Sequence, residues 1–149
     1  MADLPVIELP AFRLAALPAV DPRVAPHVRR LWVDLTLRLE SGLKSDVADI
    51  TAIGVLDSQG QSQTYSLGIP VAASTVFLPE GMRELKTEPG RFVRHTIRGP
   101  YAALPAAYEM VDRLLANAGV ERDGRSLEVY RAPNAAGATS TELYVGVRE

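Results

Sequence analysis

A strand-like run near the C-terminus, residues 126–132, carries a carboxylate and a phenol on one face. The run reads SLEVYRA, and because side chains alternate along a strand, Glu128 and Tyr130 share a face that Leu127 and Val129 do not. A partly desolvated carboxylate favours a cationic guest, and it can act as a general base toward water. Neighbouring aromatic rings would add cation–π attraction of about 0.5–2 kcal/mol each. The same pattern also fits a surface glutamate that is solvated or paired with an arginine.

Three further aromatic residues are candidates for the surroundings of this carboxylate. Trp32 and Tyr108 fall on apolar stripes of predicted helices, so each could belong either to the core or to a pocket wall. Tyr101 follows Gly99-Pro100, where its phenol could line the mouth of a cleft or bond a loop carbonyl. His95 could serve as a base, but its position within a strand is more typical of a solvated or hydrogen-bonded histidine.

The composition excludes several other classes of chemistry. The 149 residues include no cysteine, which rules out disulfides, thiolate metal sites and cysteine nucleophiles. Only two histidines are present, so we expect no metal site and no haem or other cofactor. The net charge of −2 argues against a dedicated nucleic-acid binder. No basic residue precedes Arg13 and no apolar run approaches the roughly 20 residues of a membrane span, so we expect a cytoplasmic protein without a signal peptide.

Hydrophobic periodicity predicts two helices that could position these groups. Apolar residues recur at helical spacing from Val28 to Leu39 and again from Leu104 to Leu115. Gly42 and Gly119 follow the two stripes, where glycine favours a helix stop. Strand-like runs surround the helices, and we predict strands over 12–17, 50–57, 64–71, 91–97, 127–132 and 141–147.

The order of these elements repeats within the chain. Matching features, such as Trp32 with Tyr108 and Pro10 with Pro89, lie about 76 to 79 positions apart. We therefore predict one α+β domain over residues 1–149, made of two strand–helix–strand–strand repeats (about 6–72 and 83–148) joined by a linker over 73–82. Since neither repeat can bury its own helix and sheet faces alone, the two must pair. We expect pseudo-two-fold symmetry, an antiparallel sheet with both helices on one face, and a cleft between the halves.

The second half resembles the GyrI-like effector-binding domain, which occurs in AraC- and MerR-type multidrug regulators and also alone. The resemblance rests on His95-x-x-x-Gly99-Pro100-Tyr101, a following helix with an Ala-Tyr pair, Gly119, and Leu127-Glu128-Val129-Tyr130. It implies a cleft that receives bulky, apolar and often cationic compounds, with Glu128 at its bottom. The resemblance implies this role for Glu128 among aromatic residues, and we predict that Tyr130, Trp32, Tyr101 and Tyr108 are the aromatic ligand-binding residues beside it.

The resemblance leaves more than one function open. We expect a stand-alone small-molecule-binding protein that sequesters or senses its ligand, without direct nucleic-acid contact because no helix-turn-helix precedes the domain. Some relatives are similar to hydrolases of cyclopropane-bearing natural products, in which case Glu128 would be the base and Tyr101 or Tyr130 its polar assistant. A third alternative is a protein that binds and inhibits DNA gyrase. The ligand and the oligomeric state stay open.

Overall fold

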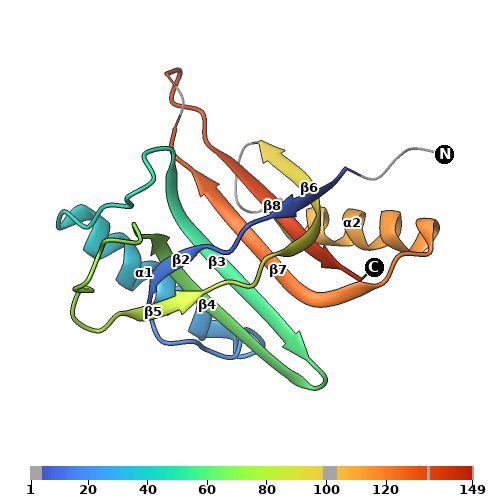
Figure 1. The fold of residues 1–149 in the computed structure, drawn as a ribbon, viewed down its shortest axis with the longest axis horizontal. Coiled ribbons are helices and arrows are strands. Elements are labelled where there is room, and N and C mark those ends of the chain that lie inside the picture. Colours follow the sequence, from blue (N-terminus) through green and yellow to red (C-terminus); the bar gives the residue numbers. More distant parts are fainter. Residues whose placement is uncertain (1–4, 99–103, 134, 149) are drawn as a thin grey trace.

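Over the residues that the structure describes, the protein has an α+β fold of two helices and one eight-stranded antiparallel sheet (Figure 1). The computed structural model describes residues 5–98, 104–133 and 135–148. In chain order the elements are β1 (Val6–Leu9), β2 (Arg13–Ala16), α1 (Ala25–Glu40), β3 (Ile50–Gln59), β4 (Ser62–Pro70), β5 (Arg83–Lys86), β6 (Gly90–Arg98), α2 (Leu104–Ala118), β7 (Arg122–Arg131) and β8 (Ser140–Val147). The sheet order is β1-β6-β8-β7-β3-β4-β2-β5.

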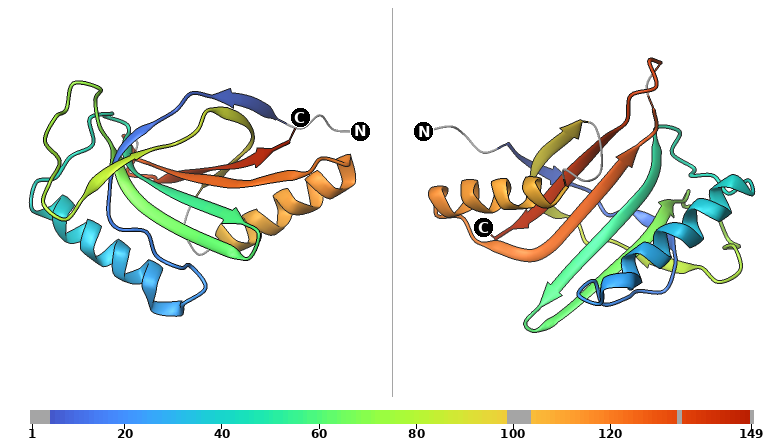
Figure 2. Two further views of the ribbon diagram at one scale, coloured as in Figure 1. Left: turned by 60° about the horizontal axis from the view of Figure 1, so that its bottom comes forward. Right: turned by 180° about the vertical axis from the view of Figure 1, so that it is seen from behind.

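The order of elements is the same in the two halves of the chain. The units β2–α1–β3–β4 and β6–α2–β7–β8 each fold a helix onto their own strands, and β3 pairs with β7 in the middle of the sheet. Both helices lie on the same face of the sheet (Figure 2). The predicted fold class, a duplicated strand–helix–strand–strand unit with an antiparallel sheet, is therefore confirmed.

Each helix begins and ends where local chemistry favours it. Pro26 lies in the first turn of α1 and Pro105 is the second residue of α2, positions where a missing N–H removes no intrahelical bond. Gly119 stops α2 in the left-handed conformation, with φ of +68°. The apolar stripes bury Leu31 and Leu35 of α1, and Ala107, Val111 and Leu115 of α2. The two helices thus have separate cores, one over each half of the sheet.

Two short edge strands, β1 and β5, were absent from the sequence prediction. β1 pairs with β6, and β5 pairs with β2, so each strand joins an element of the other half of the chain. Residues 83–86 read RELK, a short and charged segment that becomes a strand through its partner rather than through its own propensity. Together with β2 and β6 these segments cross the face opposite the helices (Figures 1 and 2), where they cover a third core that includes Leu14, Ile53, Phe92, Leu127 and Val129.

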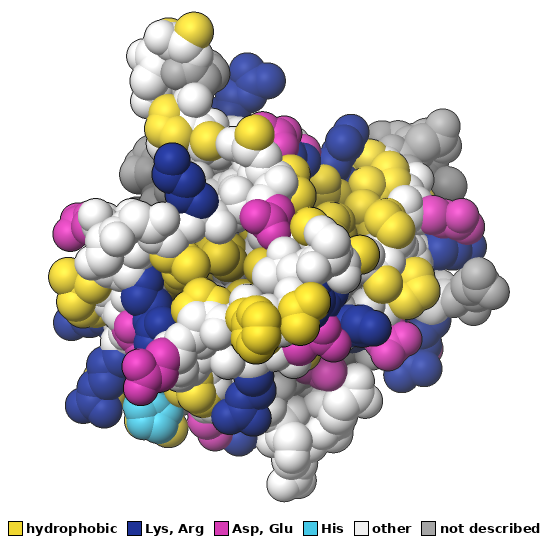
Figure 3. Space-filling model, turned by 60° about the vertical axis from the view of Figure 1, so that its left-hand side comes forward, with side chains coloured by type: hydrophobic (Ala, Val, Ile, Leu, Met, Phe, Trp, Pro, Cys, Tyr) yellow, Lys and Arg dark blue, Asp and Glu magenta, His cyan; other side chains and the backbone are white. Residues whose placement is uncertain are grey.

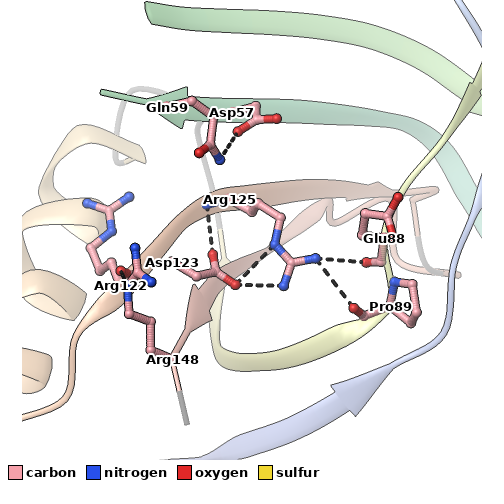
Figure 4. Close-up of polar contacts among 8 residues, drawn as sticks. All are labelled: Asp57, Gln59, Glu88, Pro89, Arg122, Asp123, Arg125 and Arg148. Atoms are coloured by element: carbon pink, nitrogen blue, oxygen red, sulfur yellow. Dashed lines mark hydrogen bonds and ion pairs between the residues drawn. The ribbon is translucent and has the colours of Figure 1, made fainter. Parts of the chain in front are cut away.

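Arg125 ties this crossing to the central sheet (Figure 4). The β7–β8 register shifts between Arg122 and Ser126, and the resulting bulge brings Asp123 against Arg125. The Arg125 guanidinium donates to the Asp123 carboxylate and to the carbonyls of Glu88 and Pro89. It also lies 5.1 Å from the centre of the Phe92 ring. The bulge therefore fastens the turn before β6 onto β7.

The surface mixes side chains of opposite charge. Seen from the flank that carries α1 and β5, basic and acidic groups alternate with apolar ones (Figure 3). The most exposed large apolar side chain among those described is Phe77, at 90% exposure, in the segment between β4 and β5. Within the described ranges, neither helix has the length and apolar character needed to cross a membrane.

Candidate functional site

A cleft of about 370 Å³ lies at the seam between the two halves on the helix-bearing face of the sheet. Its lining comes from both halves: Pro22, Val28, Trp32 and Tyr65 from the first, and Leu104, Glu128 and Tyr130 from the second. The volume falls within the range of about 300–1,000 Å³ that is usual for small-molecule sites. The lining is mostly apolar and aromatic, and among the described residues that form it Glu128 is the one carboxyl group.

Glu128 is held by three phenols. Its side chain lies on β7 directly opposite Gly54 of β3, and the residue is only 5% exposed. The Tyr65 and Tyr130 hydroxyls donate to Oε1 at 2.9 and 2.6 Å, and the Tyr108 hydroxyl donates to Oε2 at 2.7 Å. These donors come from β4, β7 and α2, so the carboxylate is fixed from three directions. A buried carboxylate is tolerable because its oxygens are hydrogen-bonded.

Burial raises the pKa of all three phenols, and the nearby Glu128 carboxylate raises it further. The effect is present at Tyr65, Tyr108 and Tyr130, each of which has loss of solvation as its largest cause. Each phenol therefore keeps its proton at neutral pH and acts as a hydrogen-bond donor. The arrangement can fix a carboxylate beside an apolar cavity, or polarise a molecule that the carboxylate contacts.

Trp32 forms the aromatic wall of the cleft. It projects from α1, and its ring meets the ring of Tyr130 edge-to-face, with 4.6 Å between the ring centres. Edge-to-face contact is one of the two arrangements that aromatic pairs favour. The indole also packs against the apolar core beneath α1. Trp32 thus takes part in both of the roles that the sequence left open, core packing and the cleft wall.

The structure brings together four of the five predicted ligand-binding residues. Trp32, Glu128 and Tyr130 line the cleft, and Tyr108 hydrogen-bonds to Glu128 from α2 without lining the cleft itself. Tyr101, the fifth, lies outside the described residues. His95 lies on β6 and does not line the cleft.

Sequence reasoning missed Tyr65. It lies on β4 in the apolar stripe with Leu67 and Ile69, and it is 4% exposed. One signal was present in the sequence: a tyrosine within a buried strand stripe needs a partner for its hydroxyl. The alternation along residues 62–70 therefore indicates a buried polar partner, although only the pairing of strands identifies that partner as Glu128.

Comparisons with known proteins match the chain over almost its whole length. The family model described as the GyrI-like small molecule binding domain matches residues 3–148. A search of curated proteins found no match.

Solved structures share the fold at low sequence identity. A protein from Staphylococcus aureus MU50 that has been assigned to bacterial transcription regulation is 14% identical over 99% of both chains, with a TM-score of 0.72. SAV2435, solved bound to tetraphenylphosphonium, is 12% identical over 99% of this chain and 94% of its own, with a TM-score of 0.71. A hydrolase encoded by lin2189 from Listeria innocua is 13% identical over 96% and 90%, with a TM-score of 0.55. On the family match, the chain belongs to the GyrI-like small molecule binding domains.

Proposed function

We propose that this protein binds bulky apolar cations in the seam cleft, for sequestration or sensing. The observation that carries the proposal is a carboxylate that is 5% exposed at the wall of a mostly apolar cavity. Transfer of a charged carboxylate away from water is costly, and an incoming positive charge offsets part of that cost. The aromatic rings of Trp32 and Tyr130 add apolar contact and cation–π attraction.

The structural neighbour that holds tetraphenylphosphonium supports the same ligand class. Tetraphenylphosphonium carries one positive charge, which four phenyl groups shield from its surroundings. The ion has no N–H or O–H group to donate. Three phenols already occupy much of the hydrogen-bonding capacity of Glu128. A guest with a shielded charge suits such a carboxylate, because it gains electrostatic attraction without needing those acceptor positions.

The test uses the single tryptophan as a reporter. Trp32 lines the cleft and is the only tryptophan in the sequence, so titration with tetraphenylphosphonium should change its fluorescence. We expect a dissociation constant in the micromolar range, about −8 kcal/mol. Glu128→Gln keeps the shape and removes the charge, and it should weaken binding of the cation at least about tenfold.

Two controls separate this role of Glu128 from a general effect. Neutral triphenylphosphine oxide should bind the wild type and Glu128→Gln with similar affinity. Glu121→Gln makes the same change at a side chain that is 82% exposed, and it should leave cation binding unchanged. Equal cation affinity in the wild type and Glu128→Gln would contradict the proposal.

A hydrolase is the second candidate, favoured by the hydrolase among the structural neighbours. Glu128 would take a proton from water as the water attacks an activated cyclopropane carbon. The ring bond breaks and its electron pair passes to the activating group, and Tyr130, the hydroxyl of which donates to Glu128, would be the polar assistant. Incubation with such a substrate in ¹⁸O-labelled water tests this candidate. A ring-opened, labelled product that Glu128→Gln cannot form would support the enzyme, and saturable binding without product would exclude it for that substrate.

A further inference from the structure

Gly54 lies directly beneath the carboxylate network. It occupies β3, where it pairs with Glu128 across the β3–β7 ladder and with Leu67 across the β3–β4 ladder. Side chains of directly opposite residues lie on the same face, so any side chain at position 54 would enter the seam.

The geometry leaves no room for such a side chain. A Cβ atom at Gly54 would lie 2.9 Å from Cζ of Tyr65 and 3.0 Å from Oε1 of Glu128, and closer still to the Tyr65 hydroxyl oxygen. The distances to the two Tyr65 atoms are shorter than real Cβ contacts and the distance to Glu128 is tighter than most of them, so the Tyr65 side chain would have to move. Tyr65 is 4% exposed and Glu128 is 5% exposed, which leaves both little freedom to do so.

The backbone gives no other reason for a glycine at this position. The glycines with positive φ among the described residues are Gly42, Gly60, Gly81, Gly119, Gly124 and Gly137, so Gly54 has a conformation open to other residues. Glycine within a strand weakens it, and often marks a close approach of another group. Here the approaching groups are a phenol from the first half of the chain and a carboxylate from the second.

We propose that Gly54 is a positioning residue for the ligand site. Its missing side chain creates the space in which Tyr65 reaches Glu128, and so it holds Oε1 in the orientation that gives the cleft its preference for cations. The inference rests on the proposed function for its binding consequence, whereas its structural part, the Tyr65–Glu128 contact, can be tested without any ligand.

The ligand-free test is the alkaline titration of tyrosine absorbance. In the wild type the three phenols around Glu128 should resist ionisation above pH 10. In Gly54→Ala, displacement of Tyr65 should bring one additional phenol into the range near pH 10. An unchanged titration in a folded Gly54→Ala protein would overturn the proposal, whatever the ligand is.

The binding test is a double-mutant cycle with Tyr65→Phe, read by Trp32 fluorescence with tetraphenylphosphonium and triphenylphosphine oxide. Gly54→Ala and Tyr65→Phe should each lower the ratio of cation to neutral affinity several-fold, and the double variant should be no worse than either. Additive losses, or equal losses for both ligands, would assign Gly54 a general structural role and overturn the proposal. Absence of cation binding in the wild type would instead refute the proposed function.

A further variant covers the case in which Gly54→Ala does not fold. Leucine at position 65 lacks both the hydroxyl and the Cζ atom that crowd position 54. Gly54→Ala combined with Tyr65→Leu should therefore recover folded protein, which supports crowding against Tyr65. Failure of this pair to fold, while Tyr65→Leu alone folds, would overturn the proposal.

Discussion

Glu128 depends on phenols from two distant segments of the chain and from its own strand. Its acceptors are occupied by phenols from β4, α2 and β7, and each phenol is shielded from water by the packing that also shields the carboxylate. The phenols act as donors because both burial and the carboxylate disfavour their ionisation. At this scale, the site is a carboxylate held in one orientation by neutral donors.

This arrangement predicts a loss of stability at alkaline pH. The pKa of Tyr65, Tyr108 and Tyr130 is higher in the folded protein than the ordinary value of about 10. Above pH 10 the unfolded chain therefore releases protons that the folded chain retains. The contribution of these phenols is complete below pH 10 and declines as the pH rises past it.

Urea unfolding at pH 8.0 and pH 10.5 measures this effect. The urea concentration at the midpoint should be lower at pH 10.5 than at pH 8.0. This decrease should be smaller in Tyr130→Phe, which removes one of the titrating groups. An equal fall in the wild type and the variant would contradict the role assigned to Tyr130.

At the scale of elements, the bulge in β7 fastens the strands that cross the face opposite the helices. Asp123 and Arg125 are 15% and 26% exposed, and the guanidinium bonds two carbonyls of the turn before β6. Hydrogen bonds to charged groups in such half-buried positions contribute more to the free energy of unfolding than exposed ion pairs do. The bulge therefore stabilises the face of the sheet opposite the helices, and neither Asp123 nor Arg125 lines the cleft.

We expect Arg125→Ala to lower the free energy of unfolding by about 1–3 kcal/mol. The reason is the loss of the bonds to Asp123, Glu88 and Pro89, together with the contact with Phe92. Thermal or urea unfolding measures the change. Arg148→Ala is the matched control, because that side chain is 64% exposed and lies 3.8 Å from Glu121, and it should stay within about 0.5 kcal/mol of the wild type.

At the scale of the whole molecule, the two halves share one sheet and one polar network. β3 and β7 pair at the centre, Tyr65 bonds Glu128 across the seam, and Trp32 packs on Tyr130 across the same seam. Separation of the halves would expose all of these groups at once. The two cores beneath the helices are therefore expected to unfold in one cooperative transition.

A core variant in one half, read by a probe in the other, tests this cooperativity. Leu115→Ala removes a side chain that is 2% exposed beneath α2, and it should cost about 2–5 kcal/mol. The midpoint measured by Trp32 fluorescence, which reports on the first half, should shift as far as the midpoint by circular dichroism. Leu114→Ala makes the same change at a residue that is 39% exposed, and it should have much less effect. A Trp32 midpoint that did not move in Leu115→Ala would mean that the halves unfold independently.

The sequence by itself determined the elements that carry a strong local signal. Helical periodicity and the prolines and glycines at helix ends located α1 and α2, and strand alternation placed Glu128 and Tyr130 on one face. The repeated order of these patterns predicted the duplicated fold. These features could be predicted because they follow from backbone geometry and from the burial of apolar stripes, both of which act over short stretches of chain.

Only the tertiary structure decided which residues meet. β1 and β5 become strands because they pair with the other half of the chain, and Tyr65 joins the site because β4 and β7 flank the same central strand. Gly54 acquires its importance in the same way, from side chains 11 and 74 positions away. Such contacts depend on strand pairing between distant segments, and that pairing is set by the packing of the whole molecule rather than by the residues near each site.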